Sequence, residues 1–177
     1  MKLVVFSDSH GGGIYIKKAL DMHRTADAAL FLGDGISDFF VWRERYPEIA
    51  FIAVRGNCDV GFGDIYNARH TEELTLDGRK IFMCHGHTYG VKGGLGSLVQ
   101  AARSRGADIV LFGHTHQKTE RYIGAEEMAE NTDGCVEGKG LYLINPGSVG
   151  GRGSDGEHSF CVLEIKENGI LASFGRL

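Results

Sequence analysis

Short apolar runs alternate with polar, glycine-containing segments along most of the 177-residue chain. The runs at residues 3–6, 28–32, 49–54 and 108–112 contain almost only aliphatic and aromatic side chains. A run of this length without polar alternation is typical of a strand that is buried on both faces. These runs therefore predict parallel strands at the centre of the fold.

Helical periodicity fills several of the segments between the runs. Apolar residues recur every three or four positions over residues 13–24 and 95–102, which predicts two amphipathic helices, the second closed by Gly106. Residues 38–46 predict a shorter helix that ends before Pro47, because proline cannot continue a helix. The order strand, helix, strand predicts a right-handed βαβ unit in the first part of the chain.

Hairpins dominate the later part of the chain. Asp77-Gly78 and Asn168-Gly169 each separate two strand-like runs, as two-residue hairpin turns do. The strand-like runs of this part lie at residues 73–76, 80–84, 118–123, 140–144, 159–165 and 170–174. Parallel units followed by hairpins predict an α/β fold with two sheets of mixed direction and helices outside them.

The amino-acid composition is typical of a globular protein and agrees with the predicted α/β fold. Hydrophobic residues make up 42% and charged residues 24% of the chain, and 27 glycines stand against 2 prolines. This balance indicates many tight turns and close backbone approaches, not a linker. We expect residues 1–177 to form a single domain.

The net charge indicates which kinds of molecule the protein could bind, and the cysteines indicate the redox state of its thiols. The formal net charge is −4 and no cluster of Lys and Arg is longer than a pair, so extended nucleic-acid binding is not expected. A phosphate substrate stays compatible, because bound divalent cations would change the local field. No stretch approaches the ~20 apolar residues of a membrane span, and the four cysteines form no C-x-x-C pair. We expect a cytoplasmic protein with reduced thiols, no membrane partner and an acidic loop at residues 126–138.

Polar side chains follow the carboxyl ends of the early runs. Asp8 and His10 follow the first run, Asp34 follows the second, and Asn57 follows the third. Parallel strands bring their carboxyl ends to one edge of a sheet, where ligand sites of α/β proteins lie. These side chains are therefore expected to converge.

Histidines follow two of the later runs. His85 and His87 follow one strand-like run, and His114 and His116 follow the run that ends at Phe112. Two residues at i and i+2 point to the same side of an extended backbone, so His114 and His116 can face one hollow. Two polar residues in an ordinary turn are the alternative.

The strand-end donors suit metal ions. All are nitrogen or oxygen donors, and none is a thiolate: Asp8, His10, Asp34, Asn57, His85, His114 and His116. One catalytic ion takes three or four protein ligands and keeps a position for water, so seven candidates fit two ions that share a carboxylate. Asp34, on the middle turn of the early strands, is the natural bridge.

Five short motifs occur in a fixed order between residues 7 and 148. They are Asp8-Ser9-His10, Gly33-Asp34, Gly56-Asn57-Cys58-Asp59, His85-Gly86-His87 and Gly113-His114-Thr115-His116, followed by Asn145-Pro146-Gly147-Ser148. Each is weak alone, but their order resembles the calcineurin-like metallophosphoesterase superfamily, and the short length resembles its small prokaryotic phosphodiesterase branch. The resemblance implies a four-layer α/β/β/α sandwich of two mixed sheets.

The resemblance also implies which residues hold which ion. A first metal would be held by Asp8, His10, Asp34 and His116, and a second by Asp34, Asn57, His85 and His114. A hydroxide between the metals would attack phosphorus in line. Asn57, His85 and His87 form the implied catalytic set, with Asn57 close to a phosphate oxygen and His87 behind the ligands or against substrate. Mn²⁺ is favoured by the resemblance, and Fe, Zn²⁺ or Ni²⁺ also suit such donors.

One position departs from many relatives. The residue after the motif asparagine is often a histidine that helps to protonate the leaving group, whereas here it is Cys58. A thiol with an ordinary pKa of about 8.5 is a poor acid at neutral pH. This substitution argues against phosphoprotein phosphatase activity and fits the small phosphodiesterases. Cys58 is equally compatible with a packing role, and Asp59 with a structural one.

The leading hypothesis is a dinuclear-metal-dependent phosphodiesterase that acts on a small or nucleotide-like ester. A phosphomonoesterase is one alternative. A silent interaction module is another, because the fold is reused for scaffolding in the retromer complex, in a branch that has lost ligand histidines. A nuclease is disfavoured by the lack of a basic stretch. The sequence leaves the oligomeric state open, including a homo-oligomer.

Several further residues match no motif. His70 and His158 are predicted to be surface or packing histidines. Arg55, Arg121 and Arg152 are candidates for contact with a phosphate, with no pattern that separates them from ordinary surface arginines.

Overall fold

The computed structural model describes residues 1–125, 139–167 and 169–177. Its elements follow in the order β1 (Lys2–Phe6), α1 (Gly13–Met22), β2 (Ala28–Phe31), α2 (Ile36–Phe40), η1 (Arg43–Arg45), β3 (Ala50–Ala53), α3 (Phe62–Ile65), β4 (Thr71–Leu76), β5 (Arg79–Cys84), η2 (His87–Tyr89), α4 (Gly96–Ser104), β6 (Ile109–Leu111), β7 (Lys118–Ile123), β8 (Leu141–Pro146), β9 (Ser159–Lys166) and β10 (Gly169–Arg176), where η marks a 3₁₀ turn. The acidic loop predicted at 126–138 and Asn168 of the second predicted hairpin turn lie outside the described residues.

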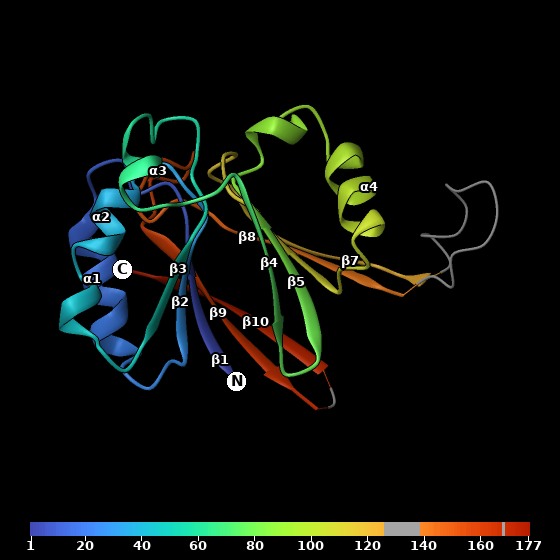
Figure 1. Cartoon of the computed structure of the whole chain (residues 1–177), viewed down its shortest axis with the longest axis horizontal. Helices are drawn as coiled ribbons and strands as arrows, with labels where there is room; N and C mark the ends of the chain where they lie inside the picture. The colour runs from blue at the N-terminus through green and yellow to red at the C-terminus, as the bar shows by residue number, and fades with distance from the viewer. Residues whose placement is uncertain (126–138, 168) are drawn as a thin grey trace.

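Two five-stranded sheets form the centre of the structure (Figure 1). The first has the order β10-β9-β1-β2-β3 and the second the order β4-β5-β6-β8-β7. β1, β2 and β3 are parallel, as are β5, β6 and β8, while β4, β7, β9 and β10 pair antiparallel to their neighbours. The predicted mixture of parallel units and hairpins is therefore confirmed.

The apolar runs are explained by burial on both faces of each sheet. In β1, Val4 and Phe6 pack beneath α1 and α2, whereas Leu3 and Val5 point into the core between the sheets. This alternation follows from the period of two along a strand. A strand with helices on one side and a second sheet on the other has no face for polar side chains.

The second sheet repeats this arrangement with α4. Phe82 and Val110 pack against Leu98 of α4, while Ile81 and Ile109 meet the first sheet. Figure 1 shows α1 and α2 on one side of the paired sheets and α4 on the other. The predicted α/β/β/α sandwich is thus confirmed. In the described part of the chain, no helix is long and apolar enough to cross a membrane.

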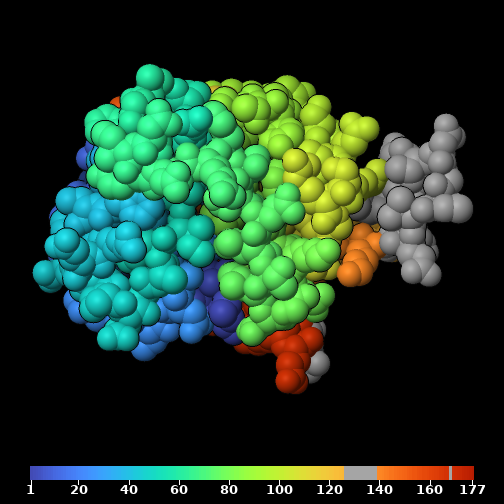
Figure 2. All heavy atoms as spheres, viewed as in Figure 1, coloured from blue at the N-terminus to red at the C-terminus, as the bar shows by residue number. Residues whose placement is uncertain are grey.

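The helix predicted at residues 38–46 is wrong in its boundaries. α2 begins earlier, after Gly35 in a left-handed conformation (φ 129°), and a separate 3₁₀ turn, η1, follows it. Between these two elements, the indole N–H of Trp42 donates to the Gly13 carbonyl at 2.8 Å. The short helix α3 was not predicted, because the glycines around it resemble a loop. In Figure 2, the green residues of α3 and of the chain after it lie on the visible surface.

Asp59 ties together the two loops that follow β2 and β3. Its buried carboxylate accepts four backbone N–H bonds, from Asp34, Gly35, Ile36 and Gly56, at 2.8–2.9 Å. The structural role that the sequence allowed for Asp59 is therefore the one observed. Through these bonds, one side chain fixes the backbone on both sides of Asp34.

Asp59→Asn is expected to lower the free energy of unfolding by about 2–4 kcal/mol, because an amide offers one acceptor oxygen and leaves buried N–H groups without partners. Urea denaturation measures this change. Glu48→Gln, at an exposed position, is the control and should change stability by less than about 0.5 kcal/mol. If Asp59→Asn lowered the free energy of unfolding no more than the control does, Asp59 would not be holding the two loops together.

Candidate metal centre

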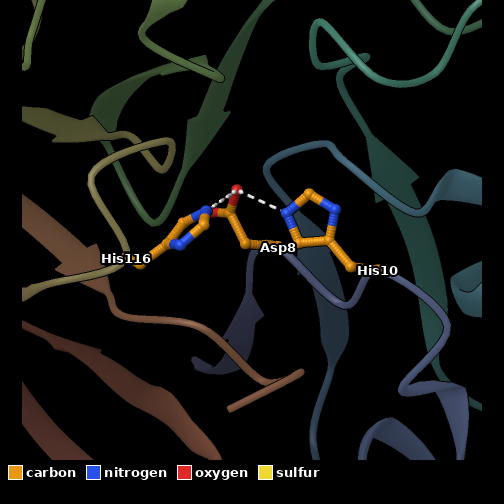
Figure 3. Close-up of side chains that lie close together, drawn as sticks. All are labelled: Asp8, His10 and His116. Carbon is orange, nitrogen blue, oxygen red and sulfur yellow. Dashed lines mark ion pairs between the residues drawn. The ribbon is translucent and has the colours of Figure 1, made fainter. Parts of the chain in front are cut away.

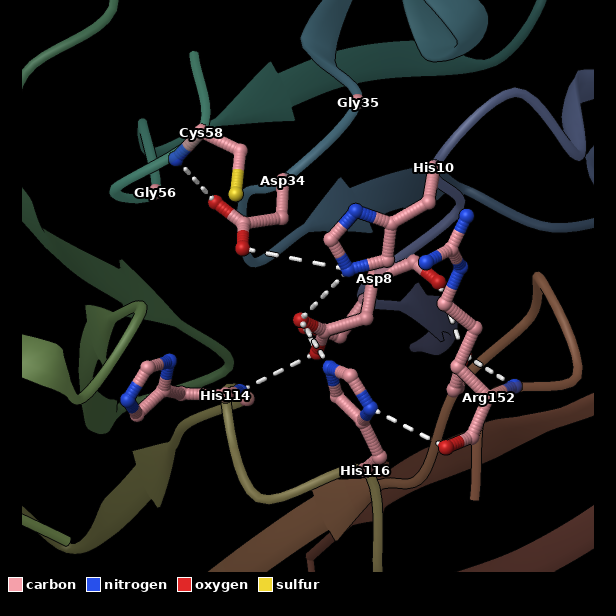
Figure 4. A network of polar contacts seen from close by, with 12 residues as sticks. Asp8, His10, Asp34, Gly35, Gly56, Cys58, His114, His116 and Arg152 are labelled. Atoms are coloured by element: carbon pink, nitrogen blue, oxygen red, sulfur yellow. Dashed lines mark hydrogen bonds and ion pairs between the residues drawn. The ribbon is translucent and has the colours of Figure 1, made fainter. Parts of the chain in front are cut away.

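The carboxyl ends of strands from both sheets meet at one place. Asp8 and His10 follow β1, Asp34 follows β2, His85 follows β5, and His114 and His116 follow β6. Figure 4 shows the labelled side chains of this set around Asp8, with the ring of His114 on one side and those of His10 and His116 on the other. The predicted convergence of strand-end donors is thus observed for these six residues.

Asp8 is the most central of these side chains and has no exposed surface. Its Oδ2 accepts hydrogen bonds from the Ser7 hydroxyl at 2.6 Å and from the His114 backbone N–H at 3.0 Å. Its Oδ1 is buried without a hydrogen-bond partner among the described residues. One oxygen therefore fixes the side chain, and the other is left to face the histidines.

His10 and His116 form the first donor group with Asp8 (Figure 3). The Nε2 atoms of His10 and His116 lie 3.7 Å and 3.2 Å from Asp8 Oδ1. The other ring nitrogen of His116, Nδ1, contacts the Arg152 carbonyl at 3.1 Å, which orients Nε2 toward the carboxylate.

His85 and His114 form the second donor group with Asp34. His85 Nε2 lies 3.4 Å from Asp34 Oδ2 and 3.2 Å from His114 Nδ1. His85 is fully buried, and its Nδ1 contacts the Leu32 carbonyl at 2.7 Å. Leu32 directly follows β2 of the first sheet, so this contact ties the end of β5 to the end of β2.

Left-handed backbone conformations concentrate at these donors. Among the described non-glycine residues with positive φ, five are candidate ligands: Asp8 (55°), His10 (42°), Asp34 (63°), His114 (66°) and His116 (59°). Such conformations cost free energy and persist only where the surroundings hold them. Their clustering indicates that the backbone of these loops directs the candidate ligands toward the site.

Two glycines let the loops approach the carboxylates. A Cβ on Gly113 would lie 1.9 Å from Ser7 Oγ and 2.9 Å from Asp8 Oδ2. A Cβ on Gly56 would lie 2.1 Å from Asp34 Oδ1. The turns that carry the donors therefore pass closer to the carboxylates than any side chain would allow.

The end of β8 and the segment that follows it support the site from behind. Asn145 is buried and donates to the Gly113 carbonyl at 2.9 Å and to Thr115 Oγ1 at 3.1 Å. The Ser148 hydroxyl donates to the Asp8 carbonyl at 2.8 Å. The sequence marked this segment only as the end of a motif set. Its function in holding the turn at Gly113 and the end of β1 is apparent only in the structure.

Burial and the neighbouring charges shift the pKa values of several of these donors. Burial alone would raise the pKa of Asp34, but the His85 hydrogen bond and charge and the Cys58 N–H hold it well below its usual range. Burial opposes protonation of His85, yet Asp34 and Asp8 raise its pKa. The hydrogen bond to Asp8 raises the pKa of His116. Burial and the neighbouring His85 lower the pKa of His114 to about 4.

Asn57 and Cys58 lie in the exposed loop after β3. The Cys58 N–H donates to Asp34 Oδ1 at 2.7 Å, and the Asn57 amide donates to the Cys58 sulfur at 3.3 Å. Burial and the hydrogen bond to Asp34 raise the pKa of Cys58 to about 11, so its thiol stays protonated at neutral pH. The structure therefore brings Asn57 to the edge of the site, with its amide directed at Cys58.

His87 lies behind the second donor group. Its ring centroid lies 5.4 Å from that of His85 and 6.2 Å from that of His114. Its Nδ1 is buried without a hydrogen-bond partner among the described residues. Burial, followed by the neighbouring His85 and His70, lowers its pKa, which favours the neutral ring.

His70 is closer to the site than the sequence predicted. Its ring centroid lies 5.9 Å from that of His87, although 17 positions separate the two residues in the chain. The sequence missed this proximity because no motif surrounds His70, and only the pairing of β4 with β5 brings its segment alongside His87.

The donor set fits divalent metal ions. Asp8 Oδ1 and His10 Nε2 are both buried without hydrogen-bond partners in the described chain, and each lies within 4 Å of further donors. A buried carboxylate oxygen surrounded by imidazole nitrogens is stabilised by a cation. Residues Asp8, His10, Asp34, His85, His114 and His116 could hold such ions and bind an anionic ester beside them.

Sequence comparison finds relatives over nearly the whole chain. A probable metallophosphoesterase of Bacillus subtilis is 29% identical over 175 residues, which cover 98% of this chain and 90% of the relative. A phosphodiesterase of Methanocaldococcus jannaschii is 27% identical over 163 residues, which cover 85% of this chain and 86% of the relative.

Structural comparison finds the same fold in solved proteins. A predicted phosphoesterase of Streptococcus pneumoniae superposes with a TM-score of 0.75 at 24% identity, covering 98% of this chain and 87% of that one. Vps29 of Entamoeba histolytica, solved in complex with Zn²⁺, gives a TM-score of 0.70 at 22% identity over 99% of both chains. At these identities the likeness establishes the architecture alone.

A family model settles the relationship that the motifs indicated. Residues 1–168 match the calcineurin-like phosphoesterase superfamily domain, whose members depend on metals. This match includes both donor groups and the segment that supports them. The chain therefore belongs to the calcineurin-like phosphoesterase superfamily, and its membership supports phosphoesterase activity.

Proposed function

We propose that the chain hydrolyses a small or nucleotide-like phosphodiester with the help of two divalent metal ions. The observation that carries this proposal is that Asp34, a member of the second donor group, also faces a histidine of the first. Its Oδ2 lies 3.4 Å from His85 Nε2 and 3.9 Å from His10 Nε2, so one carboxylate faces a histidine of each group. A shared carboxylate is typical of two-metal hydrolytic sites.

The proposed ligands divide between two ions. Asp8, His10 and His116 would hold the first, and His85 and His114, together with Asn57, would hold the second, with Asp34 common to both. When bound, the ions would neutralise charge on the phosphate and make a water molecule acidic enough to act as the nucleophile. The lowered pKa of Asp34 keeps it ionised, as a ligand must be.

Three side chains of the chain itself would take part in the reaction. Asn57, at the edge of the site, would donate to a phosphate oxygen. His85 would stabilise the charge that develops on the phosphoryl oxygens through the ion that it holds, because its Nδ1 faces the Leu32 carbonyl and its Nε2 faces the second donor group. His87 would support His85 and His114 from behind, since its Nδ1 is buried without a partner among the described residues. The thiol of Cys58, with a pKa of about 11, is too weak an acid to protonate a leaving group efficiently. This favours diesters over the substrates of phosphoprotein phosphatases.

The native metal, the domain organisation, the cellular location and the rival functions go beyond what family membership gives. Mn²⁺ is the proposed native metal, with Fe, Zn²⁺ and Ni²⁺ as chemically suitable alternatives. A single domain over residues 1–177 and a cytoplasmic location stay predictions. A phosphomonoesterase and a silent interaction module are the rival functions, and the full set of six converging donors argues against the second.

Hydrolysis of bis(p-nitrophenyl) phosphate in the presence of Mn²⁺ is expected to fall by about 100-fold or more in Asp34→Asn and in His114→Ala, because each removes a donor that the charged transition state requires. Release of nitrophenolate measures the rate. Glu48→Gln should retain the wild-type rate. Unchanged rates in both site variants would refute the proposed function.

Loss of His114 and loss of His116 are expected to empty different metal positions, because the two histidines belong to different donor groups. Each single alanine variant should bind one Mn²⁺ per chain instead of two. Metal analysis of the purified protein gives the stoichiometry, and electron paramagnetic resonance detects loss of coupling between neighbouring ions. A single variant that loses both ions, or that retains both, would contradict this division.

Mn²⁺ affinity is expected to decrease as the pH falls from about 8 to about 6. The hydrogen bond to Asp8 raises the pKa of His116, and Asp34 and Asp8 raise that of His85 against the effect of burial, so both rings retain protons to higher pH. A proton must leave each ring before its nitrogen binds a metal. Calorimetry in buffers of different ionisation enthalpy should therefore detect proton release on binding. Affinity that does not change with pH would contradict this expectation.

A further inference from the structure

A second polar cluster extends from the candidate metal centre toward α3. It consists of Arg55, His70 and Asp64, and it meets the site through His87. The His70 ring lies 5.9 Å from the His87 ring, which in turn lies 5.4 Å from the His85 ring. The cluster is therefore one residue removed from the second donor group.

Arg55 is oriented by two hydrogen bonds in this cluster. Its Nε–H donates to His70 Nε2 at 3.1 Å, and its Nη1 donates to Asp64 Oδ1 at 2.8 Å. A Cβ on Gly63 would lie 2.5 Å from Arg55 Cδ, so the aliphatic stem lies directly against the backbone of α3. A guanidinium fixed in this way loses little side-chain entropy when it binds an anion.

The hydrogen bonds also define which donors remain for a ligand. Because His70 Nε2 accepts from Arg55, its proton in the neutral ring is on Nδ1, which can then donate. The second terminal nitrogen of Arg55 makes no hydrogen bond that involves the described residues in this cluster. His70 is exposed and the Arg55 side chain is 30% exposed, so both side chains are in contact with solvent.

We propose that Arg55 and His70 form a subsite for a second phosphate of the substrate, beyond the phosphate that is cleaved. This inference rests on the proposed phosphodiesterase function and narrows its substrate class to phosphodiesters that carry an additional phosphate, such as nucleotides phosphorylated at a further position. Arginine is suited to this task because its planar fork donates paired hydrogen bonds to phosphate oxygens. Asp64, with its side chain 83% exposed, orients Arg55 from the solvent side.

Two chromogenic esters that differ only in one phosphate test this subsite. They are the p-nitrophenyl ester of thymidine 5′-phosphate and the same compound with an additional 3′-phosphate. In the presence of Mn²⁺, the wild-type protein should show a KM about tenfold lower for the doubly phosphorylated ester, as expected for one or two charge-assisted hydrogen bonds. The kcat values for the two esters should be similar, because the subsite does not touch the reacting phosphorus.

Arg55→Gln should remove this preference by raising KM for the doubly phosphorylated ester alone, with kcat for the simpler ester within about twofold of wild type. His70→Asn, at an exposed position, should reduce the preference in part. Arg43→Gln is the matched control, because Arg43 is exposed and lies in η1, outside the site. Thermal unfolding of each variant shows whether the fold is retained.

The outcomes separate this inference from the proposed function. Absence of hydrolysis of both esters by the wild-type protein would refute the function. Hydrolysis without preference, or a preference that persists in both variants, would refute the subsite alone. Equal KM changes for both esters in Arg55→Gln would also refute it, since they indicate a merely structural role. Calorimetric binding of thymidine 3′,5′-bisphosphate and thymidine 5′-phosphate to wild type and Arg55→Gln tests the subsite directly, and the same selective loss is expected there.

Discussion

A carboxylate buried between the two sheets is the constraint on which the site depends. Asp8 lies at the end of β1, and its Oδ2 is bound by Ser7 from its own loop and by the backbone of His114 from the other sheet. A buried carboxylate is costly unless it is paired, so these bonds hold the ends of β1 and β6 together. The remaining oxygen then faces His10, His85 and His116 at 3.2–3.9 Å. The same contact therefore joins the sheets and leaves an oxygen for a cation.

The loops around this carboxylate are strained and must be held by their surroundings. Five candidate ligands have positive φ, and each such conformation costs on the order of 1 kcal/mol or more. Asp59 holds the loop of Asp34 through backbone N–H bonds, and Asn145 holds the turn at Gly113. None of these holding groups would touch the substrate. The stability of the fold and the orientation of the candidate ligands thus depend on the same hydrogen bonds.

Prediction from the sequence succeeded where burial is nearly complete. The run of β1 has no polar position because helices cover one face and the second sheet covers the other, and this pattern is visible without coordinates. Prediction failed for α2, whose first backbone N–H groups donate to Asp59, which lies 23 positions beyond Ile36. It also failed for His70, whose neighbour His87 is reached through the hairpin of β4 and β5. Both errors involve contacts between residues that are distant along the chain.

The sequence by itself determined the strands, because the pattern of apolar and polar residues is a local property of the chain. The order of its motifs indicated the family, and the resemblance to that family implied the sandwich architecture. It also determined that the donors would converge, since parallel strands end at one edge of a sheet. The resemblance to the family implied how the donors divide, but only the tertiary structure shows the physical basis of the division: His116 lies with Asp8 and His10, and His114 lies with Asp34 and His85. Two histidines at i and i+2 can point to one hollow in an extended chain. Both have left-handed φ values in the turn after β6, and this backbone conformation, held by Asn145 and by close packing at Gly113, directs them to different groups.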